Sequence, residues 1–324
     1  MRFFPTAARF FCRAPALRRM LRHANRHRIT ILMYHGVTAE PLGVNNWCHM
    51  PVAEFAAQME FVAAHYNLLP LSEVVNRLTA HTTLPDHPAC VTFDDGFLNI
   101  LRNALPVLDK HNIPFTVFIT TQLAETKAPP WPEEVFSALL RSTRSSFTFQ
   151  GKSLPLSTAG DRKQAFEKVM QLLKSTATAD RQRLQDAVMR DIAGDLAEAP
   201  ADETFATLDW HDIANLAQTG LAEFGSHTHS HEILTNCSPD EQRRQLDISH
   251  RLLLDHLGRC DLLAYPNGDY SDTVKKMARE AGYRAAVTTE HVLNHADVDV
   301  YALGRIGVGA GWSMERFEIK VLGY

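Results

Sequence analysis

Residues 88–93 form an apolar run that ends in two adjacent carboxylates, Asp94 and Asp95, followed by Gly96. An apolar run of this length before a turn residue predicts a buried strand. Two neighbouring acids repel and raise each other's pKa, so the pair is costly unless it has a chemical role. Metal binding by one carboxylate and proton transfer by the other would use both. An ordinary Asp-Asp-Gly turn or helix cap is the structural alternative.

The chain is long and apolar enough to form a packed α/β core. It has 324 residues, of which 45% are hydrophobic, and α/β barrels of this length often form one domain. Its five cysteines are odd in number and lack CxxC or zinc-finger spacing, which favours a reducing compartment and predicts a cytoplasmic protein. No apolar run reaches the roughly 18 residues expected of a membrane-spanning helix.

Residues 1–28 form a basic extension that contrasts with an acidic body. The extension holds eight arginines and no acid, although the whole chain carries 33 Lys+Arg against 37 Asp+Glu. The acidic body argues against a nucleic-acid surface outside the extension. Apolar residues spaced three and four apart predict an amphipathic helix, which Pro5 and Pro15 interrupt. Such a helix could hold the protein peripherally on an anionic inner membrane, pack on the body, stay partly disordered, or act as a transit peptide.

Strands alternate with helices along residues 29–324, which predicts one domain built on a parallel α/β sheet. Apolar runs predict seven strands, at 29–34, 88–93, 114–119, 221–224, 261–265, 285–289 and 300–306. Chemically unusual residues follow several of these strands, at the end where parallel α/β folds place their sites. Residues 125–205 interrupt the alternation with a predicted hairpin and polar helices. We interpret them as a helical insertion that covers one side of the body and carries no cluster typical of a site.

A second group of candidate ligands follows the strand predicted at 221–224. His227 and His231 are four residues apart, with His229 between them. Imidazoles at this separation can reach one metal ion, and they suit Zn²⁺ and other first-row metals. Two histidines and one aspartate would leave coordination positions open, as in a catalytic centre. Three histidines in five residues could also form an exposed polar turn.

These two motifs together resemble a known family. Residues 92–96, Thr-Phe-Asp-Asp-Gly, and residues 227–231, His-Thr-His-Ser-His, are similar to the first and second motifs of the polysaccharide deacetylases with a NodB-homology domain, carbohydrate esterase family 4. The resemblance covers about 29–123 and 207–324, and it implies a distorted (β/α)7 barrel. It also implies that Asp94 is the catalytic base and that Asp95, His227 and His231 bind a divalent metal. Zinc is the expected metal, with cobalt, nickel or manganese as alternatives.

The third motif departs from the family pattern. Residues 264–268 and the Tyr34-His35 pair look more like an exopolysaccharide and poly-N-acetylglucosamine deacetylase branch, in which the resemblance implies that the Tyr265 backbone N–H stabilises the oxyanion. Ala264 stands where the family's base-orienting arginine is expected, and Arg305 could restore that charge. The substrate groove is expected to involve His35, the Tyr265 ring, Pro266 and Arg305. The family's general-acid histidine has no clear counterpart.

The motifs and the resemblance together predict a metal-dependent amide hydrolase. Its expected substrate is an N-acetylated sugar of a bacterial exopolysaccharide or glycolipid, from which it removes acetyl groups. A deformylase or deacetylase of a lipid-linked sugar would keep the same site. A carbohydrate-binding relative without turnover is the alternative from another class, although the intact acid and histidine set argues against it.

Overall fold

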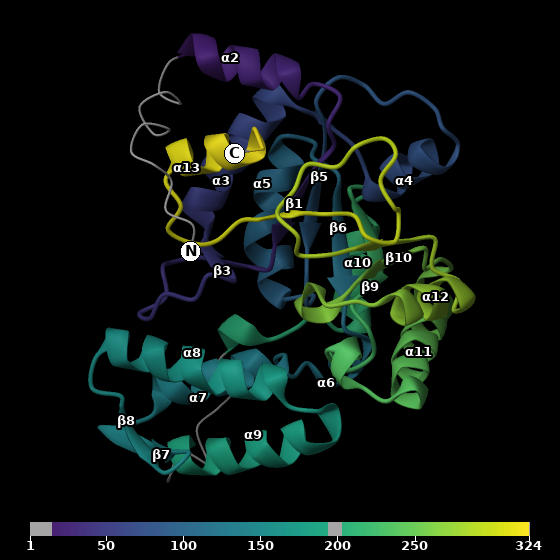
Figure 1. The fold of residues 1–324 in the computed structure, drawn as a ribbon. Coiled ribbons are helices and arrows are strands. Elements are labelled where there is room, and N and C mark those ends of the chain that lie inside the picture. The colour runs from purple at the N-terminus through teal and green to yellow at the C-terminus, as the bar shows by residue number, and fades with distance from the viewer. Residues whose placement is uncertain (1–14, 194–202, 324) are drawn as a thin grey trace.

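The structure of this chain is a computed structural model that describes residues 15–193 and 203–323. Its centre is a parallel sheet (Figure 1). The strands on the main path of this sheet are β1 (Thr30–Tyr34), β5 (Pro88–Phe93), β6 (Phe115–Ile119), β9 (Ala222–Ser226), β10 (Leu262–Ala264), β11 (Ala285–Val287) and β12 (Ile306–Gly307). They lie in the order β11-β10-β9-β6-β5-β1-β12, and the short β4 (Asn67–Leu68) pairs with β5 off this path.

The sheet is curled, so the predicted α/β fold with a distorted seven-stranded barrel is confirmed. Every pairing along the path is parallel, with Tyr34 opposite Phe93 and Val117 opposite both Phe93 and Phe224. A parallel sheet exposes all its carboxyl ends at one edge, so the residues that follow β1, β5, β9 and β10 meet there. All six residues of β5 are buried, which agrees with a central strand covered on both faces.

The last strand is shorter than its predicted range of 300–306. Only Ile306 and Gly307 pair with β1, whereas Leu303 forms an isolated parallel bridge with Val287 of β11. Between these pairings, the Asn294 side chain bonds both the N–H and the carbonyl of Gly304, each at 2.8 Å. The Asn294 side chain therefore takes the place of a neighbouring strand as the hydrogen-bond partner of Gly304. The two edge strands, β11 and β12, approach each other here without continuous backbone pairing.

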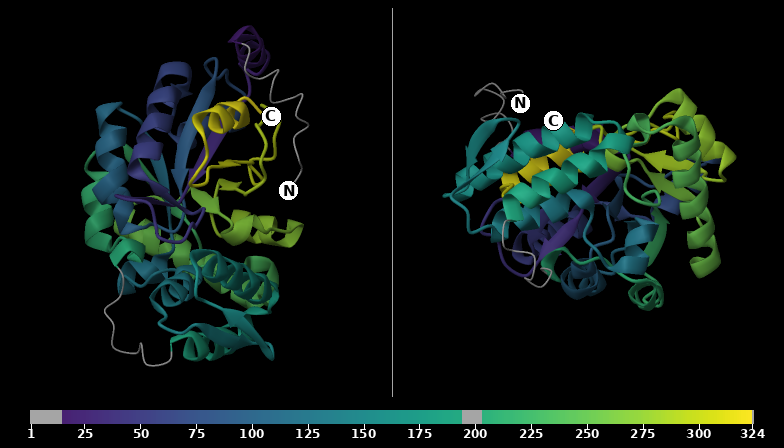
Figure 2. Two further views of the ribbon diagram at one scale, coloured as in Figure 1. Left: turned by 90° about the vertical axis from the view of Figure 1, so that its left-hand side faces the viewer. Right: turned by 90° about the horizontal axis from the view of Figure 1, so that it is seen from below.

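Helices cover the outside of the sheet (Figure 2). Those of the body are α3 (Val52–His65), α4 (Leu71–Thr79), α5 (Leu105–Lys110), α6 (Thr121–Thr126), α10 (Trp210–Ala217), α11 (Pro239–Leu257), α12 (Asp272–Glu280) and α13 (Met314–Val321). A π-helical turn (Ile100–Ala104) precedes α5, and short 3-10 turns lie at Glu203–Phe205, Leu234–Asn236 and Pro266–Gly268. A small parallel pair, β2 (Gly36–Thr38) and β3 (His49–Pro51), lies beside the end of β1.

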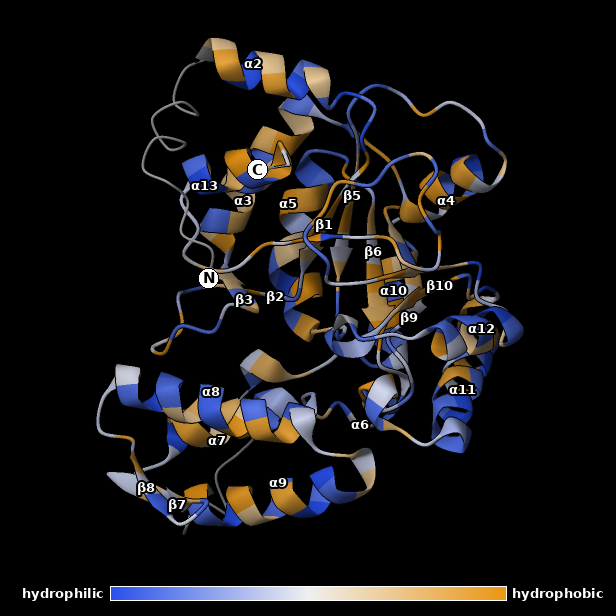
Figure 3. Ribbon diagram, in the orientation of Figure 1, coloured by the Kyte–Doolittle hydropathy of each residue, from blue (hydrophilic) through white to orange (hydrophobic). Residues whose placement is uncertain are grey.

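The insertion forms a layer of its own across the carboxyl end of the sheet (Figure 1). Its elements are α7 (Trp131–Arg141), the hairpin of β7 (Ser146–Phe149) and β8 (Lys152–Pro155), α8 (Ala159–Ser175) and α9 (Thr178–Ala193). They share a separate apolar cluster that includes Val135, Val169 and Ile192. Figure 3 shows mixed hydrophobic and hydrophilic residues along α8 and α9, typical of amphipathic helices that cover a core.

The described part of the N-terminal extension is a helix packed on the body. This helix, α2 (Pro15–Ala24), precedes β1 and therefore lies at the amino end of the sheet, opposite the insertion (Figure 1). Arg18 forms an ion pair with Glu318 of α13, and the Arg22 guanidinium lies 5.7 Å from the Phe61 ring of α3. Pro5 lies outside the described residues. Within the described residues, no helix is both long enough and apolar enough to span a membrane.

Candidate active site

The carboxyl ends of β5 and β9 bring one aspartate and two histidines together. Asp95 Oδ1 lies 3.4 Å from His227 Nε2 and 3.1 Å from His231 Nε2. The three possible ligand atoms all lie within 4.8 Å of one another. Asp95 and His227 are buried, and His231 is nearly so. The two motifs are more than 130 residues apart in sequence, and they meet above β6, which separates β5 from β9 in the sheet.

The charges and hydrogen bonds of this cluster suit a metal ion. Burial lowers the pKa of His227 to about 4, so its imidazole is neutral at neutral pH. Its Nδ1 lies 2.8 Å from the Ala264 carbonyl, which can only accept a hydrogen bond, so Nδ1 carries the proton. The lone pair of Nε2 therefore faces the Asp95 carboxylate. A cation between these two atoms would stabilise the arrangement, and the donor set fits a divalent transition metal.

Unusual backbone geometry shapes both ligand loops. Asp95, Thr228 and His231 have φ values of 69°, 65° and 58°, in the left-handed region that ordinary residues rarely adopt. Each costs on the order of 1 kcal/mol or more, and such residues concentrate at functional sites. The histidine loop is held by Gln245, whose Oε1 accepts hydrogen bonds from the N–H groups of His229 and Ser230.

Residues of the insertion contact the loop that carries His231 through a hydrogen bond and an ion pair. The indole N–H of Trp131 donates to the His231 carbonyl at 3.2 Å. Arg181 of α9 forms a buried ion pair with Glu232, the next residue, through Nη2 and Oε1 at 2.5 Å. The same guanidinium lies 4.7 Å from the centre of the Trp131 ring. The insertion therefore supports the candidate site. The sequence did not indicate this role, because Trp131 and Arg181 form no motif with the histidines.

Asp94 lies beside the cluster in a buried ion pair with Arg305. Its two carboxylate oxygens each accept a hydrogen bond of 2.7 Å from the guanidinium. Burial alone would raise the pKa of Asp94, but the charge and hydrogen bonds of Arg305 hold it below its usual value. Arg305 is 0% exposed, and its two terminal nitrogens both bond Asp94, so the structure places it as the partner of this carboxylate and not on an exposed surface. It instead provides the positive charge that is missing at position 264. Arg305 immediately precedes β12, which lies on the other side of β1 from β5.

Tyr265 is also placed differently from its predicted role. Its backbone N–H donates to the Val287 carbonyl at 3.2 Å, so it is already used in the sheet and is not free for an oxyanion. Its ring is 0% exposed, and its hydroxyl donates to the Tyr301 carbonyl at 3.1 Å. The ring therefore belongs to the core and cannot line a groove. Pro266, the other residue predicted to contact substrate here, is buried in the 3-10 turn that follows.

The remaining predicted residue, His35, lies at the end of the strand next to the one that carries the carboxylates. His35 follows β1, and the Asp94 N–H donates to the carbonyl of the preceding Tyr34 at 3.0 Å, so His35 and Asp94 end neighbouring strands. Burial lowers the pKa of His35, while the charges of Asp95 and Asp94 act in the opposite direction. Near it lie Trp47, whose ring contacts His35, and two buried groups, His49 and Glu133, at 3.6 Å from each other. His229 does not join the cluster, since its Nδ1 lies 3.0 Å from Thr121 Oγ1.

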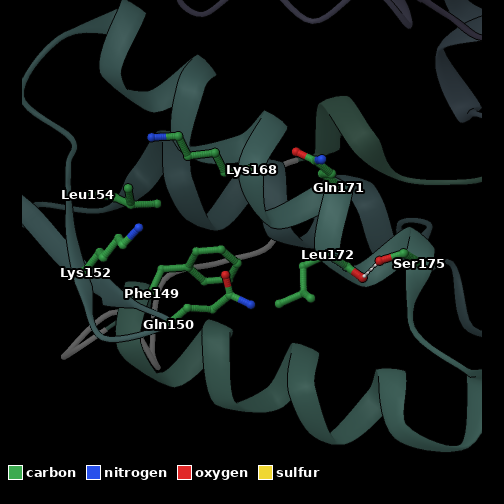
Figure 4. Close-up of a pocket in the computed structure, with 8 residues that line it drawn as sticks. All are labelled: Phe149, Gln150, Lys152, Leu154, Lys168, Gln171, Leu172 and Ser175. Atoms are coloured by element: carbon green, nitrogen blue, oxygen red, sulfur yellow. Dashed lines mark hydrogen bonds between the residues drawn. The ribbon is translucent and has the colours of Figure 1, made fainter.

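A surface pocket in the insertion is separate from this site (Figure 4). It lies between the β7–β8 hairpin and α8, and the side chains that line it are Phe149, Gln150, Lys152, Leu154, Lys168, Gln171, Leu172 and Ser175. None of these residues belongs to the aspartate and histidine cluster.

The chain is similar to known proteins in both sequence and structure. A family model described as polysaccharide deacetylase matches residues 81–286, which is more than half of the chain. The chain is 23% identical over 293 residues to YxkH, a Bacillus subtilis protein described as a polysaccharide deacetylase, covering 90% of this chain and 75% of YxkH.

Two solved structures share the fold. One is the Streptococcus pyogenes deacetylase PplD in complex with acetate, with a TM-score of 0.62 and 20% identity over 91% of this chain and 98% of PplD. The other is IcaB from Ammonifex degensii, with a TM-score of 0.58 and 18% identity over 92% of this chain and 98% of IcaB.

Proposed function

This chain belongs to the polysaccharide deacetylase family, and we propose that it uses a divalent metal to remove N-acetyl groups from a sugar of a bacterial exopolysaccharide or glycolipid. The observation that carries the proposal is the convergence of Asp95, His227 and His231 beside a second carboxylate, Asp94. Two imidazoles and one carboxylate favour Zn²⁺ and leave positions open, as catalytic centres require. Cobalt, nickel and manganese are the alternative metals.

The residues of the chain divide the work of amide hydrolysis. A metal bound by the three ligands would supply a water of lowered pKa and polarise the acetamide carbonyl. Asp94 is the proposed base, because it is ionised and stands next to the ligand Asp95. Arg305 holds both oxygens of Asp94, which fixes the direction in which this carboxylate accepts the proton. Hydrolysis then releases acetate and leaves a free amine on the sugar.

Acetate release from oligomers of N-acetylglucosamine tests the reaction. The zinc-loaded protein is expected to release acetate, and chelation is expected to abolish this until zinc is restored. Asp94→Asn keeps the size of the side chain but removes the base, so the rate should fall at least about 100-fold. An unchanged rate in Asp94→Asn would show that another group takes the proton.

Zinc content tests the ligand assignment separately from activity. His227→Ala and His231→Ala should each lose zinc, because each removes one of three protein ligands. His229→Ala is the matched control, since His229 lies between the two ligands in sequence but contacts Thr121 instead. Retention of full zinc content by both ligand variants would contradict the proposed centre.

A lipid-linked sugar is the second candidate substrate. It would be favoured if the basic extension brought a membrane surface to the site. The position of α2 at the amino end of the sheet argues against this, because the cluster lies at the carboxyl end (Figure 1). Equal rates on soluble and membrane-embedded substrates, with and without residues 1–28, are therefore expected.

A further inference from the structure

A tryptophan is exposed at the rim of the proposed site. Trp47 is 48% exposed, and it is one of four exposed large hydrophobic side chains in the described part of the chain. The other three are Met20 on α2, Leu254 on α11 and Val292. An exposed large aromatic ring is unfavourable in water, so its position beside a candidate active site suggests a binding role.

The position of Trp47 is fixed by a ring contact and by backbone hydrogen bonds of its loop. The Trp47 ring meets the His35 ring edge-on, with ring centres 4.9 Å apart and an angle of 77° between the planes. The Trp47 carbonyl accepts a hydrogen bond from the Ala310 N–H at 3.2 Å, and the Cys48 carbonyl accepts one from Gly36 at 2.9 Å. The loop is thus fastened to two parts of the body. A ring fixed in this way loses little conformational entropy when a ligand packs on it.

A short series of contacts connects Trp47 to the proposed base. Its ring touches His35, which follows β1 directly. The end of β1 is hydrogen-bonded to the N–H of Asp94 at 3.0 Å. In the sheet order, β1 lies next to β5, on the side away from β9. Trp47 therefore lies one strand beyond the carboxylate pair, and not above the metal ligands themselves.

A polar bridge lies on the other side of the cluster. Lys174 of α8 donates a hydrogen bond of 2.8 Å to Asn267 Oδ1 in the turn after β10. Since β10 lies next to β9, this bridge and Trp47 flank the cluster on opposite sides along the sheet. A polymer that crosses the site in this direction would place one sugar ring at the cluster and a neighbouring ring near Trp47.

We propose that Trp47 is a stacking platform for the sugar ring next to the one that is deacetylated. One face of a pyranose ring carries mainly C–H groups, which pack favourably on the electron-rich face of an indole. The hydroxyl groups at the edge of the sugar stay in water. The platform thus selects a chain of sugars over a single sugar. This inference rests on the proposed function, because it assumes an N-acetylated saccharide at the cluster.

Steady-state kinetics on a chitin tetramer test the platform. Trp47→Ala should raise KM about tenfold and leave kcat within about twofold, because the stacking contact is the same in the ground state and the transition state. Trp47→Phe should recover part of the affinity, since it restores a smaller aromatic face. Leu254→Ala is the matched control, because it removes an apolar side chain of similar exposure, 45%, from α11. An unchanged KM in Trp47→Ala would overturn the platform.

Binding without turnover separates this inference from the proposed function. In the Asp94→Asn background, calorimetry should show that the tetramer binds at least about tenfold more tightly than the single sugar. Trp47→Ala should remove most of this difference. If the wild-type protein releases acetate but Trp47→Ala does not change the tetramer affinity in the Asp94→Asn background, the platform alone is overturned. A wild-type protein that neither binds the tetramer nor releases acetate would overturn both the platform and the proposed substrate.

Discussion

Asp94 and Arg305 form a buried ion pair in which the replacement of either residue alone leaves a buried charge without a partner. Both side chains are almost completely buried, and two parallel hydrogen bonds join them. A buried ion pair need not stabilise a fold compared with an apolar pair, but it becomes very unfavourable when one partner is removed. The guanidinium thus keeps Asp94 ionised beside a second carboxylate, Asp95, although the two negative charges repel each other. Arg305 acts through Asp94 and is a positioning residue.

Replacement of Arg305 is expected to destabilise the fold. Arg305→Met leaves the Asp94 carboxylate buried without a partner, so the free energy of unfolding should fall by about 3–5 kcal/mol. Urea denaturation followed by circular dichroism measures this loss. The double variant Asp94→Asn with Arg305→Met should recover a large part of it, because the unpaired charge is then gone.

An exposed ion pair provides the control for this prediction. Arg102 and Glu203 lie 3.3 Å apart, with side chains 55% and 81% exposed. Arg102→Met should change the free energy of unfolding by less than about 1 kcal/mol. A loss in Arg305→Met no larger than in Arg102→Met would mean that the buried pair does not hold Asp94 in place.

Among the secondary-structure elements, the insertion contributes most unexpectedly to the site. Helices α7 and α9 supply Trp131 and Arg181, which contact His231 and Glu232 in the ligand loop. Gln185 extends this network to Glu134 of α7 through a hydrogen bond of 2.6 Å. Groups behind a metal ligand set its orientation, and their loss commonly weakens metal binding. The insertion is therefore expected to act as a support for the metal centre.

Loosening this support should lower the affinity for zinc. Trp131→Phe removes the indole N–H and keeps a smaller aromatic ring, and Arg181→Met breaks the pair with Glu232. Each variant should bind zinc about 10-fold more weakly or worse, measured by competition with a chromogenic chelator.

A control within the insertion separates support of the loop from general damage. Arg162 donates hydrogen bonds to the carbonyls of Leu140 and Ser142, which both lie inside the insertion. Arg162→Met should keep zinc affinity within about twofold of wild type even if the insertion is less stable. Equal weakening in all three variants would indicate that the insertion matters only for folding.

At the scale of the whole molecule, the curled parallel sheet gathers strand ends that are distant in sequence. The proposed base and one proposed ligand follow β5, two further proposed ligands follow β9, and Arg305 immediately precedes β12. The site can therefore form only when the sheet is assembled in this order. A metal bound across β5 and β9 would also link these parts of the fold, since it binds the folded state and not the unfolded chain.

Zinc is accordingly expected to stabilise the protein against heat. At a free zinc concentration about 100 times the Kd, the stabilisation should be about 2.7 kcal/mol, which corresponds to a rise in Tm of roughly 4 °C for a chain of this length. Differential scanning calorimetry of the chelated and zinc-loaded protein measures this shift. The double variant His227→Ala with His231→Ala should show almost no shift, and an equal shift in that variant would place the stabilising zinc elsewhere.

Much of the fold and the central cluster could be predicted from the sequence because both depend on local patterns. Apolar runs predicted the strands on the main path of the sheet, although the last strand is shorter than predicted and the short β4 was not predicted. The Asp-Asp-Gly and His-x-x-x-His patterns identified the residues that converge, because each pattern lies within a few residues of a strand end. Local spacing is also sufficient to predict the helices and the hairpin of the insertion.

The surroundings of the cluster depended on the tertiary structure. Arg305 is 211 residues from Asp94 in sequence, and only the adjacency of β12, β1 and β5 brings its guanidinium to the carboxylate. The Tyr265 N–H was expected at an oxyanion, but pairing with β11 uses it in the sheet. Trp131 and Trp47 reach the site through the packing of a separate layer and a rim loop. The sequence determined which residues form the candidate site, because that information is local. The order of the strands and the packing of the insertion determined what surrounds them, because such contacts join segments with no shared pattern.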